Sequence, residues 1–146
     1  MPLLDKRIEV HAPPRQVFEV LGHVERWPRW MPLDVRCARV TEKQGAGMVV
    51  RHESNACGTR ISWDAVAEEW LPGKRIAFRQ VTGDWDRAAM TWDLQSSPKG
   101  CVVRLRADLA LPHTLEVEVT EDAAQDELSR SLDEALLNLK DLVEAP

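Results

Sequence analysis

The middle of the chain, from residue 35 to residue 109, is a run of alternating apolar and polar segments separated by short turn sequences. The turns are rich in Gly, Pro and Asn, as in NACG at 55–58 and LPGK at 71–74. Connections this short join antiparallel neighbours, because a parallel crossover needs roughly a dozen residues or more. We therefore expect antiparallel strands at Val35–Thr41, Met48–Ser54, Thr59–Glu69, Arg75–Val81, Asp86–Gln95 and Cys101–Leu109.

A long amphipathic helix is expected after these strands, from about Asp122 to Val143. Thr120 or Asp122 can cap its first turn. Its apolar residues recur at helical spacing and form a single stripe, which can cover the apolar face of a sheet. The stripe consists of Leu128, Leu132, Ala135, Leu139 and Leu142.

The first third of the chain predicts one strand and two short helices. Leu4–His11 has strand character. The pair Pro13-Pro14 that follows favours the start of a short helix, which we expect to end at Gly22. Val24–Met31 resembles a second short helix, interrupted by Pro28. The whole order predicts an α+β helix-grip fold, in which a curved antiparallel sheet of about seven strands wraps around the long C-terminal helix.

The composition of the chain excludes several classes of partner and site. The 146 residues fit one domain, residues 1–146, with 19 basic and 24 acidic residues and no cluster of five or six like charges. Without concentrated positive charge we expect no nucleic-acid partner. Without an apolar run near the ~20 residues of a membrane span we expect no integral membrane association. The first residues are too few and too charged for a signal peptide, which favours a cytoplasmic location. Three widely spaced cysteines argue against a disulfide framework and a zinc site. The sequence also has no Gly-rich phosphate loop and no His-cluster metal spacing, so no metal or cofactor is expected.

Two segments carry a resemblance to a known superfamily: HAPPRQVFEVLGHVERWPRWMP and TRISWDAVAEEWLPGKRIAFRQVTGDWDRAAMTWDL. They resemble the START-like or Bet v 1-like (SRPBCC) superfamily, and within it the polyketide cyclase/dehydrase branch. Its members include aromatase/cyclases, ubiquinone-binding proteins and lipid carriers. The resemblance implies a deep cavity between the sheet and the long helix.

Strand alternation then indicates which side chains line that cavity. Trp27 and Trp30, on the second short helix, are expected at its mouth. The expected ligand-binding residues are Trp27, Trp30, Met48, Val50, His52, Ile61, Trp63, Ala65, Ala67, Phe78, Met90, Trp92 and Leu128.

His52 is the candidate catalytic residue, because an imidazole titrates near neutral pH and can act as a general acid or base. It can equally orient a ligand carbonyl, or be satisfied by a neighbouring carbonyl. His113 is a second candidate near the cavity entrance. The resemblance also implies an inward arginine in the cyclases, at the position that Ala67 occupies here, unless Arg39 or Arg51 replaces it.

Three functions remain open from the sequence. The preferred one is binding of a small hydrophobic or polycyclic molecule, such as a polyketide, quinone or lipid, by a monomer or homodimer. The first alternative is a polyketide cyclase/dehydratase enzyme of the aromatase type. The second is a protein-interaction module with a packed interior.

Overall fold

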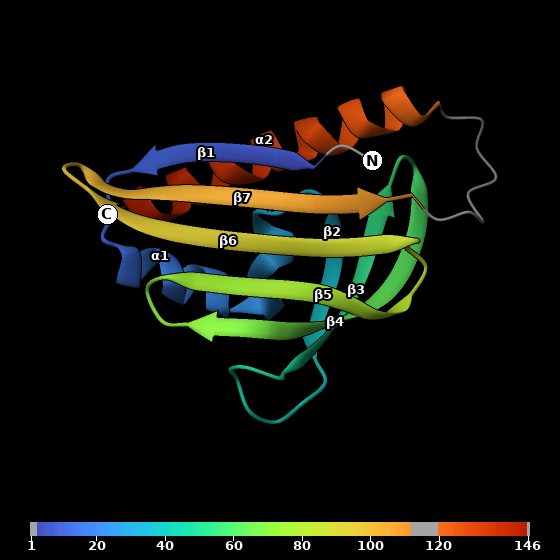
Figure 1. Ribbon diagram of the computed structural model, residues 1–146, viewed down its shortest axis with the longest axis horizontal. Coiled ribbons are helices and arrows are strands. Elements are labelled where there is room, and N and C mark those ends of the chain that lie inside the picture. Colours follow the sequence, from blue (N-terminus) through green and yellow to red (C-terminus); the bar gives the residue numbers. More distant parts are fainter. Residues whose placement is uncertain (1–2, 112–119, 146) are drawn as a thin grey trace.

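The computed structural model describes residues 3–111 and 120–145 and contains one sheet and three helical segments (Figure 1). Expected strand and helix positions match within a few residues. In chain order the elements are β1 (Leu4–Val10), α1 (Pro14–Gly22), η1 (Val24–Arg29), β2 (Asp34–Arg39), β3 (Val49–Ala56), β4 (Thr59–Leu71), β5 (Arg75–Gly83), β6 (Arg87–Ser97), β7 (Gly100–Ala110) and α2 (Glu121–Glu144).

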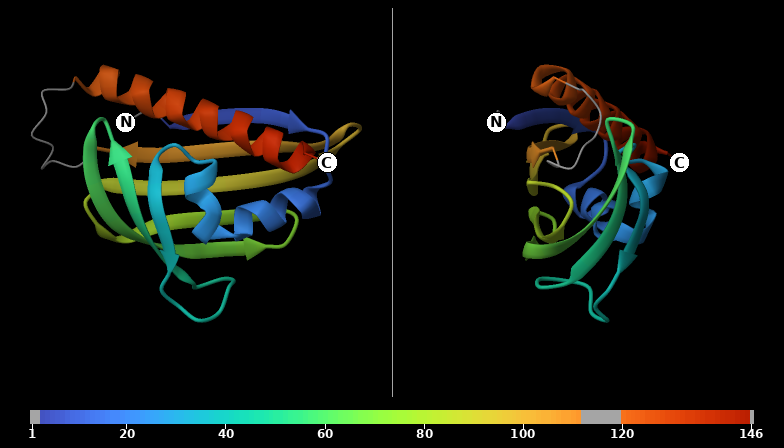
Figure 2. Two further views of the ribbon diagram at one scale, coloured as in Figure 1. Left: turned by 180° about the vertical axis from the view of Figure 1, so that it is seen from behind. Right: turned by 90° about the vertical axis from the view of Figure 1, so that its right-hand side faces the viewer.

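The seven strands form one antiparallel sheet in the order β1-β7-β6-β5-β4-β3-β2. Strands β2 to β7 follow one another as a meander, and β1 closes the order beside β7. The sheet curls, and α1, η1 and α2 lie on its concave side (Figure 2). This arrangement confirms the helix-grip fold expected from the strand and helix order.

Helix α2 presents an apolar stripe to the concave face of the sheet. The Thr120 side chain caps it by accepting a hydrogen bond from the Ala123 N–H at 3.1 Å. The expected stripe is buried except for Leu142, which is 49% exposed. The expectation for Leu142 was wrong, because in the last turn Val143, four residues after Leu139, faces the core instead. No helix in the described ranges is long and apolar enough to cross a membrane.

The two short helical segments follow one another along the chain, and each buries side chains in the core. Pro14 begins α1, which buries Val17, Phe18 and Leu21. The second segment is a 3₁₀ helix with Pro28 inside it. Proline has no backbone N–H to donate, so this sequence suits a short, tight turn better than an extended α-helix.

Gly83, at the end of β5, leaves the space that the inward-facing Trp63 of β4 occupies. The two residues are register partners, and Gly83 has a φ of 146°. A Cβ at Gly83 would collide with the Cβ of Trp63. A side chain at position 83 would therefore push Trp63 out of position.

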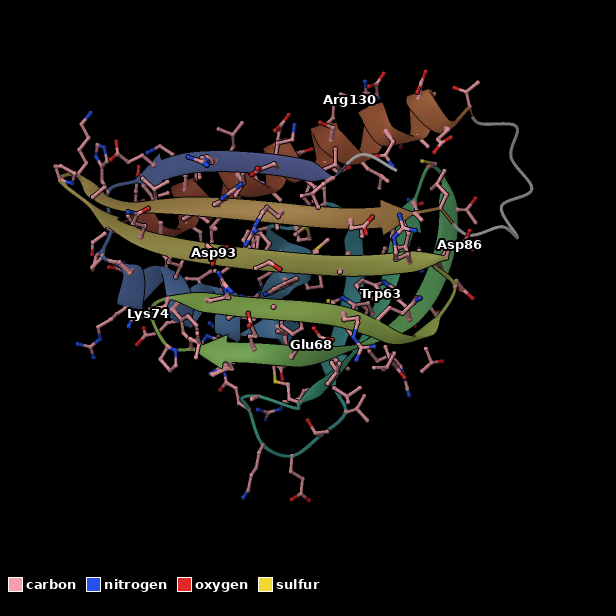
Figure 3. The ribbon with its side chains drawn as sticks, in the orientation of Figure 1. Trp63, Glu68, Lys74, Asp86, Asp93 and Arg130 are labelled. Carbon is pink, nitrogen blue, oxygen red and sulfur yellow. The ribbon has the colours of Figure 1, made fainter. Side chains whose placement is uncertain are left out.

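Arginine–carboxylate pairs cross-link the outer face of the sheet (Figure 3). Asp93 of β6 accepts hydrogen bonds from Arg75 of β5 at 2.6 Å and from Arg106 of β7 at 2.7 Å. Burial raises the pKa of the Asp93 carboxyl, but these hydrogen bonds outweigh that effect and hold its pKa below the ordinary value. The lowered pKa means that the ionised carboxylate stabilises the fold.

We expect Leu132→Ala to lower the free energy of unfolding by about 2–5 kcal/mol, because Leu132 is fully buried and its loss leaves a cavity under α2. Leu137→Ala is the matched control, since Leu137 is 58% exposed on the same helix. Denaturant unfolding compares the two variants. Equal losses would mean that α2 does not pack as described.

We expect Asp93→Asn to lower stability by roughly 1 kcal/mol at pH 7. A depressed folded-state pKa gives stability that is present above the unfolded value of 3.8 and is lost as the pH falls through the lower folded value. The difference between wild type and variant should therefore shrink in acid. Denaturant unfolding at several pH values measures it, with the exposed Asp126→Asn on α2 as control. A difference that stays constant down to strongly acidic pH would contradict the assignment.

Candidate functional site

The centre of the concave side is a cluster of aromatic rings around Trp27. Its ring centroid lies 5.4 Å from that of Trp30, 5.5 Å from Phe78, 5.8 Å from Trp92 and 6.1 Å from His52. The Trp27 indole N–H donates to the Leu21 carbonyl at 2.9 Å. Trp27 is only 2% exposed, so it lies inside the protein and not at a cavity mouth as expected.

All the other expected lining residues are buried on the inner side of the sheet or beneath α2. The alternation therefore gave the correct inward face for β3, β4, β5 and β6. Whether these residues contact a ligand stays a prediction. They are Trp30, Met48, Val50, His52, Ile61, Trp63, Ala65, Ala67, Phe78, Met90, Trp92 and Leu128.

A register shift in β2 creates a polar cluster beside these rings. The shift lies between Asp34 and Arg36, and it places Asp34 and Cys37 on the same inward face although they are three residues apart. On β3, Ser54 pairs with Asp34, and His52 pairs with Cys37. Two strands thus bring four buried polar or thiol side chains together.

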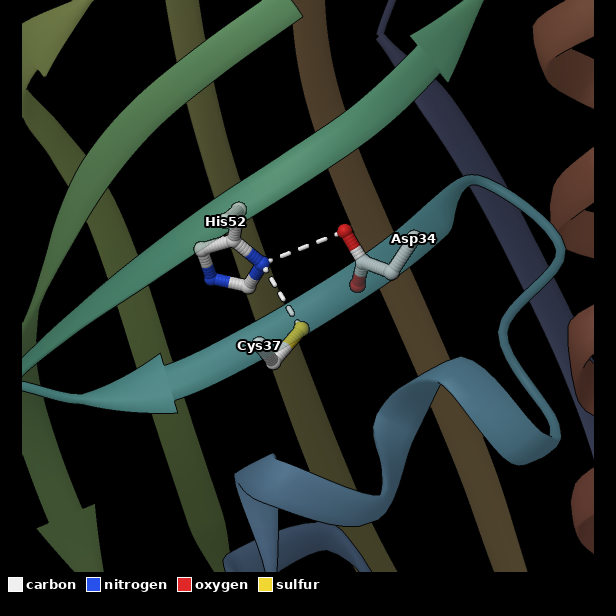
Figure 4. A group of neighbouring side chains, drawn as sticks. All are labelled: Asp34, Cys37 and His52. Atoms are coloured by element: carbon white, nitrogen blue, oxygen red, sulfur yellow. Dashed lines mark hydrogen bonds and ion pairs between the residues drawn. The ribbon is translucent and has the colours of Figure 1, made fainter.

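The contacts in this cluster converge on Asp34 and His52 (Figure 4). His52 Nδ1 lies 3.1 Å from Asp34 Oδ1 and 3.3 Å from Cys37 Sγ. The Ser54 hydroxyl donates to Asp34 Oδ1 at 2.9 Å, and the Trp63 indole N–H donates to Ser54 Oγ at 2.9 Å. The Trp63 ring stacks on the imidazole with centroids 4.2 Å apart. His52 is thereby held in one orientation.

The thiol of Cys37 is chemically unlike an exposed cysteine. Burial, and then the neighbouring Asp34 carboxylate, raise its pKa. Cys37 is therefore a neutral thiol in the protein as described, not a reactive thiolate. Oxygen, sulfur and nitrogen atoms arranged in this way can nevertheless hold a metal ion.

Asp34 and Cys37 are not predicted from the sequence as partners of His52. A strand that begins at Val35 and alternates strictly cannot place residues 34 and 37 on one face. The available signal was a carboxylate between two apolar residues, Leu33 and Val35. The register shift that turns Asp34 and Cys37 to the same face has no recognisable signature in this sequence.

A groove opens between α1, η1 and the C-terminal end of α2. Its volume is about 560 Å³. Its apolar side is formed by Val20, Trp30 and Leu142, while Arg26 and Arg29 give it positive charge. The remaining lining residues are His23, Asn138, Asp141 and Ala145. Trp30 belongs both to this groove and to the ring cluster, where its centroid lies 5.7 Å from that of Trp92.

Three buried tryptophans carry an indole N–H that has no acceptor among the described residues: Trp30, Trp85 and Trp92. Leaving a buried donor unsatisfied costs about 1–3 kcal/mol. Native proteins usually remove this cost with ordered water or a bound molecule. The interior therefore offers donors to an incoming acceptor atom.

The arginine that the cyclases are expected to use has no inward replacement in the described ranges. Ala67 is buried at the aligned position. Arg51 donates to Asp64 on the exposed side, and Arg39 pairs with Glu25. The buried polar or charged residues of the described chain are Asp34, His52, Ser54 and Gln125. His113 lies outside the described residues.

Comparison with solved structures shows the same fold in proteins of low sequence identity. TTHA0849 from Thermus thermophilus has a TM-score of 0.85 at 22% identity, covering 99% of this chain and 98% of that one. A START superfamily protein from Mycobacterium smegmatis gives 0.77 at 16%, with 97% of each chain covered. The Zhui aromatase/cyclase from Streptomyces sp. R1128 gives 0.70 at 20%, covering 97% of this chain and 90% of that one.

No curated protein matches the chain. A family profile does, over residues 1–144, and it is described as "Polyketide cyclase / dehydrase and lipid transport". This match spans both short helices, the whole sheet and the long helix. The chain therefore belongs to the polyketide cyclase/dehydrase and lipid transport family.

Proposed function

We propose that the protein binds a small, flat, amphipathic molecule with oxygen acceptors, such as a polyketide or a quinone, in the groove floored by Trp30. One observation carries the proposal: the groove of about 560 Å³ lies against a buried tryptophan whose N–H has no acceptor among the described residues. Ligand sites of 300–1,000 Å³ are typically apolar with a few polar groups, and this groove fits that description.

The groove supplies two kinds of interaction. A ring system that buries about 150 Å² of apolar surface against Val20, Trp30 and Leu142 gains roughly 4 kcal/mol before the costs of association. The Trp30 N–H is itself enclosed, so an acceptor oxygen on the ligand would take it only by displacing the side chains that cover it. Arg26 and Arg29 outnumber Asp141 in the lining, so an anionic phenolate or carboxylate is favoured over a cation.

Family membership supports this class of ligand. The family description joins polyketide chemistry with lipid transport, and the similar structures include a START superfamily protein and an aromatase/cyclase. Polyketides and quinones combine flat apolar rings with carbonyl oxygens, which suits a tryptophan floor and N–H donors. The proposal keeps the expected cytoplasmic location and a monomeric or homodimeric state.

The cyclase alternative has less support. Enolate chemistry needs donors aimed at a developing oxyanion. The expected arginine position is Ala67, and Arg39 and Arg51 pair with Glu25 and Asp64. The interaction-module alternative draws support from the ring contacts that occupy the interior, but it gives no role to the open groove.

We expect tryptophan fluorescence to show saturable quenching when the protein is titrated with a hydroxyanthraquinone, a naphthoquinone or a flavonoid. Trp30→Phe keeps an aromatic floor and removes the N–H, so it should weaken binding about 5- to 10-fold, the value of one hydrogen bond. Trp70→Phe is the matched control, because Trp70 packs on Phe18 and does not line the groove.

The ligand panel also includes a fatty acid and a sterol. Saturation by these alone, with no response to the flat oxygenated probes, would replace the proposed class with a lipid. An absence of saturation by every probe would favour the interaction module. Equal affinities of Trp30→Phe and wild type would remove Trp30 from the site.

A further inference from the structure

We propose that Asp34, Cys37 and His52 form a binding site for one divalent transition-metal ion of the zinc class. The three side chains offer one carboxylate oxygen, one sulfur and one imidazole nitrogen, and these atoms lie within 4.8 Å of one another. All three residues are buried. The inference is independent of the ligand groove, because none of the three residues lines it.

Two of the three distances between the donor atoms are close to those of a metal shell. Zinc bonds of about 2.0–2.3 Å at tetrahedral angles place neighbouring donors about 3.3–3.6 Å apart. His52 Nδ1 lies 3.1 Å from Asp34 Oδ1 and 3.3 Å from Cys37 Sγ. These two pairs would have to separate by only a few tenths of an ångström to admit an ion, and the third pair, the Asp34 oxygen and the Cys37 sulfur, lies within 4.8 Å.

The surrounding residues hold these donors in place. The register shift in β2 turns Asp34 and Cys37 to one face, and backbone pairing with β3 sets His52 directly opposite Cys37. Ser54 donates to the Asp34 carboxylate, and Trp63 stacks on the imidazole. Outer contacts of this kind orient metal ligands and strengthen binding.

Charge balance and ligand type both indicate a divalent ion of the zinc class. Binding of the ion releases the proton of the Cys37 thiol to solvent, and the resulting thiolate and the Asp34 carboxylate together offset the two positive charges of the ion, so the buried site as a whole becomes neutral. Sulfur and imidazole ligands select zinc, cobalt or copper over magnesium and calcium, which prefer oxygen alone. Three protein ligands leave a fourth position for water or for a donor atom of a bound molecule.

Cobalt and zinc titrations of the full chain test the site. We expect uptake of one equivalent of Co²⁺, with a thiolate-to-cobalt charge-transfer band that Zn²⁺ abolishes by competition. Cys37→Ser should lose the band. It should also weaken zinc binding by about 100-fold or more, because the loss of an outer-shell contact alone typically weakens metal binding about 10- to 100-fold. The matched control is Cys57→Ser combined with Cys101→Ser, which leaves Cys37 as the chain's only cysteine.

The double variant also decides the question if Cys37→Ser does not fold. A thiolate–cobalt band in the double variant supports the site, and its absence overturns it. Saturable cobalt binding without a thiolate band would assign the ion to exposed histidines such as His11 and His23, and would also overturn the proposal. Failure of wild type to bind one equivalent of either metal would do the same.

Discussion

The indole of Trp27 joins the short helices to the sheet, and the arrangement of the concave side depends on this junction. Its N–H is bonded to the Leu21 carbonyl of α1, while its ring contacts Phe78 on β5 and Trp92 on β6. Because Trp27 anchors η1 over the sheet, Trp30 is placed with one side against Trp92 and another in the groove. One buried ring thus determines where the groove opens.

Two chemically different regions meet at this ring. On one side is the groove with its cationic arginines, and on the other is the neutral-to-acidic cluster of Asp34, Cys37, Ser54 and His52, whose imidazole centroid lies 6.1 Å from that of Trp27. The cluster depends on backbone geometry, namely a register shift in β2. The groove depends on packing between helices. A substitution in one region should therefore leave the local structure of the other largely intact, since no hydrogen bond among the described residues joins them, and Trp27, whose ring lies near that of His52, does not line the groove.

Much of the fold followed from local sequence patterns. Alternation with a period of two assigned Ile61, Trp63 and Ala65 to the inner face correctly, because the strand geometry leaves only two faces to choose from. Residues whose environment is set by distant contacts were harder. Leu142 continues the helical stripe in the sequence, yet it faces the groove because Val143 takes the core position. The shared inward face of Asp34 and Cys37 depends on a register shift that strict alternation excludes. The burial of Trp27 depends on how deeply η1 packs against the sheet, which the local sequence does not determine.

The most direct test of ligand binding at Trp30 is an NMR spectrum of the six indole N–H groups, recorded with ¹⁵N-labelled tryptophan during titration with a hydroxyanthraquinone. Assignment comes from single tryptophan-to-phenylalanine variants. We expect the Trp30 N–H signal to move downfield and saturate at one equivalent, as a donor does on gaining an acceptor, while the signal of Trp27, already bonded to Leu21, moves less. An unchanged Trp30 signal at saturating ligand would mean that the ligand does not bind at Trp30.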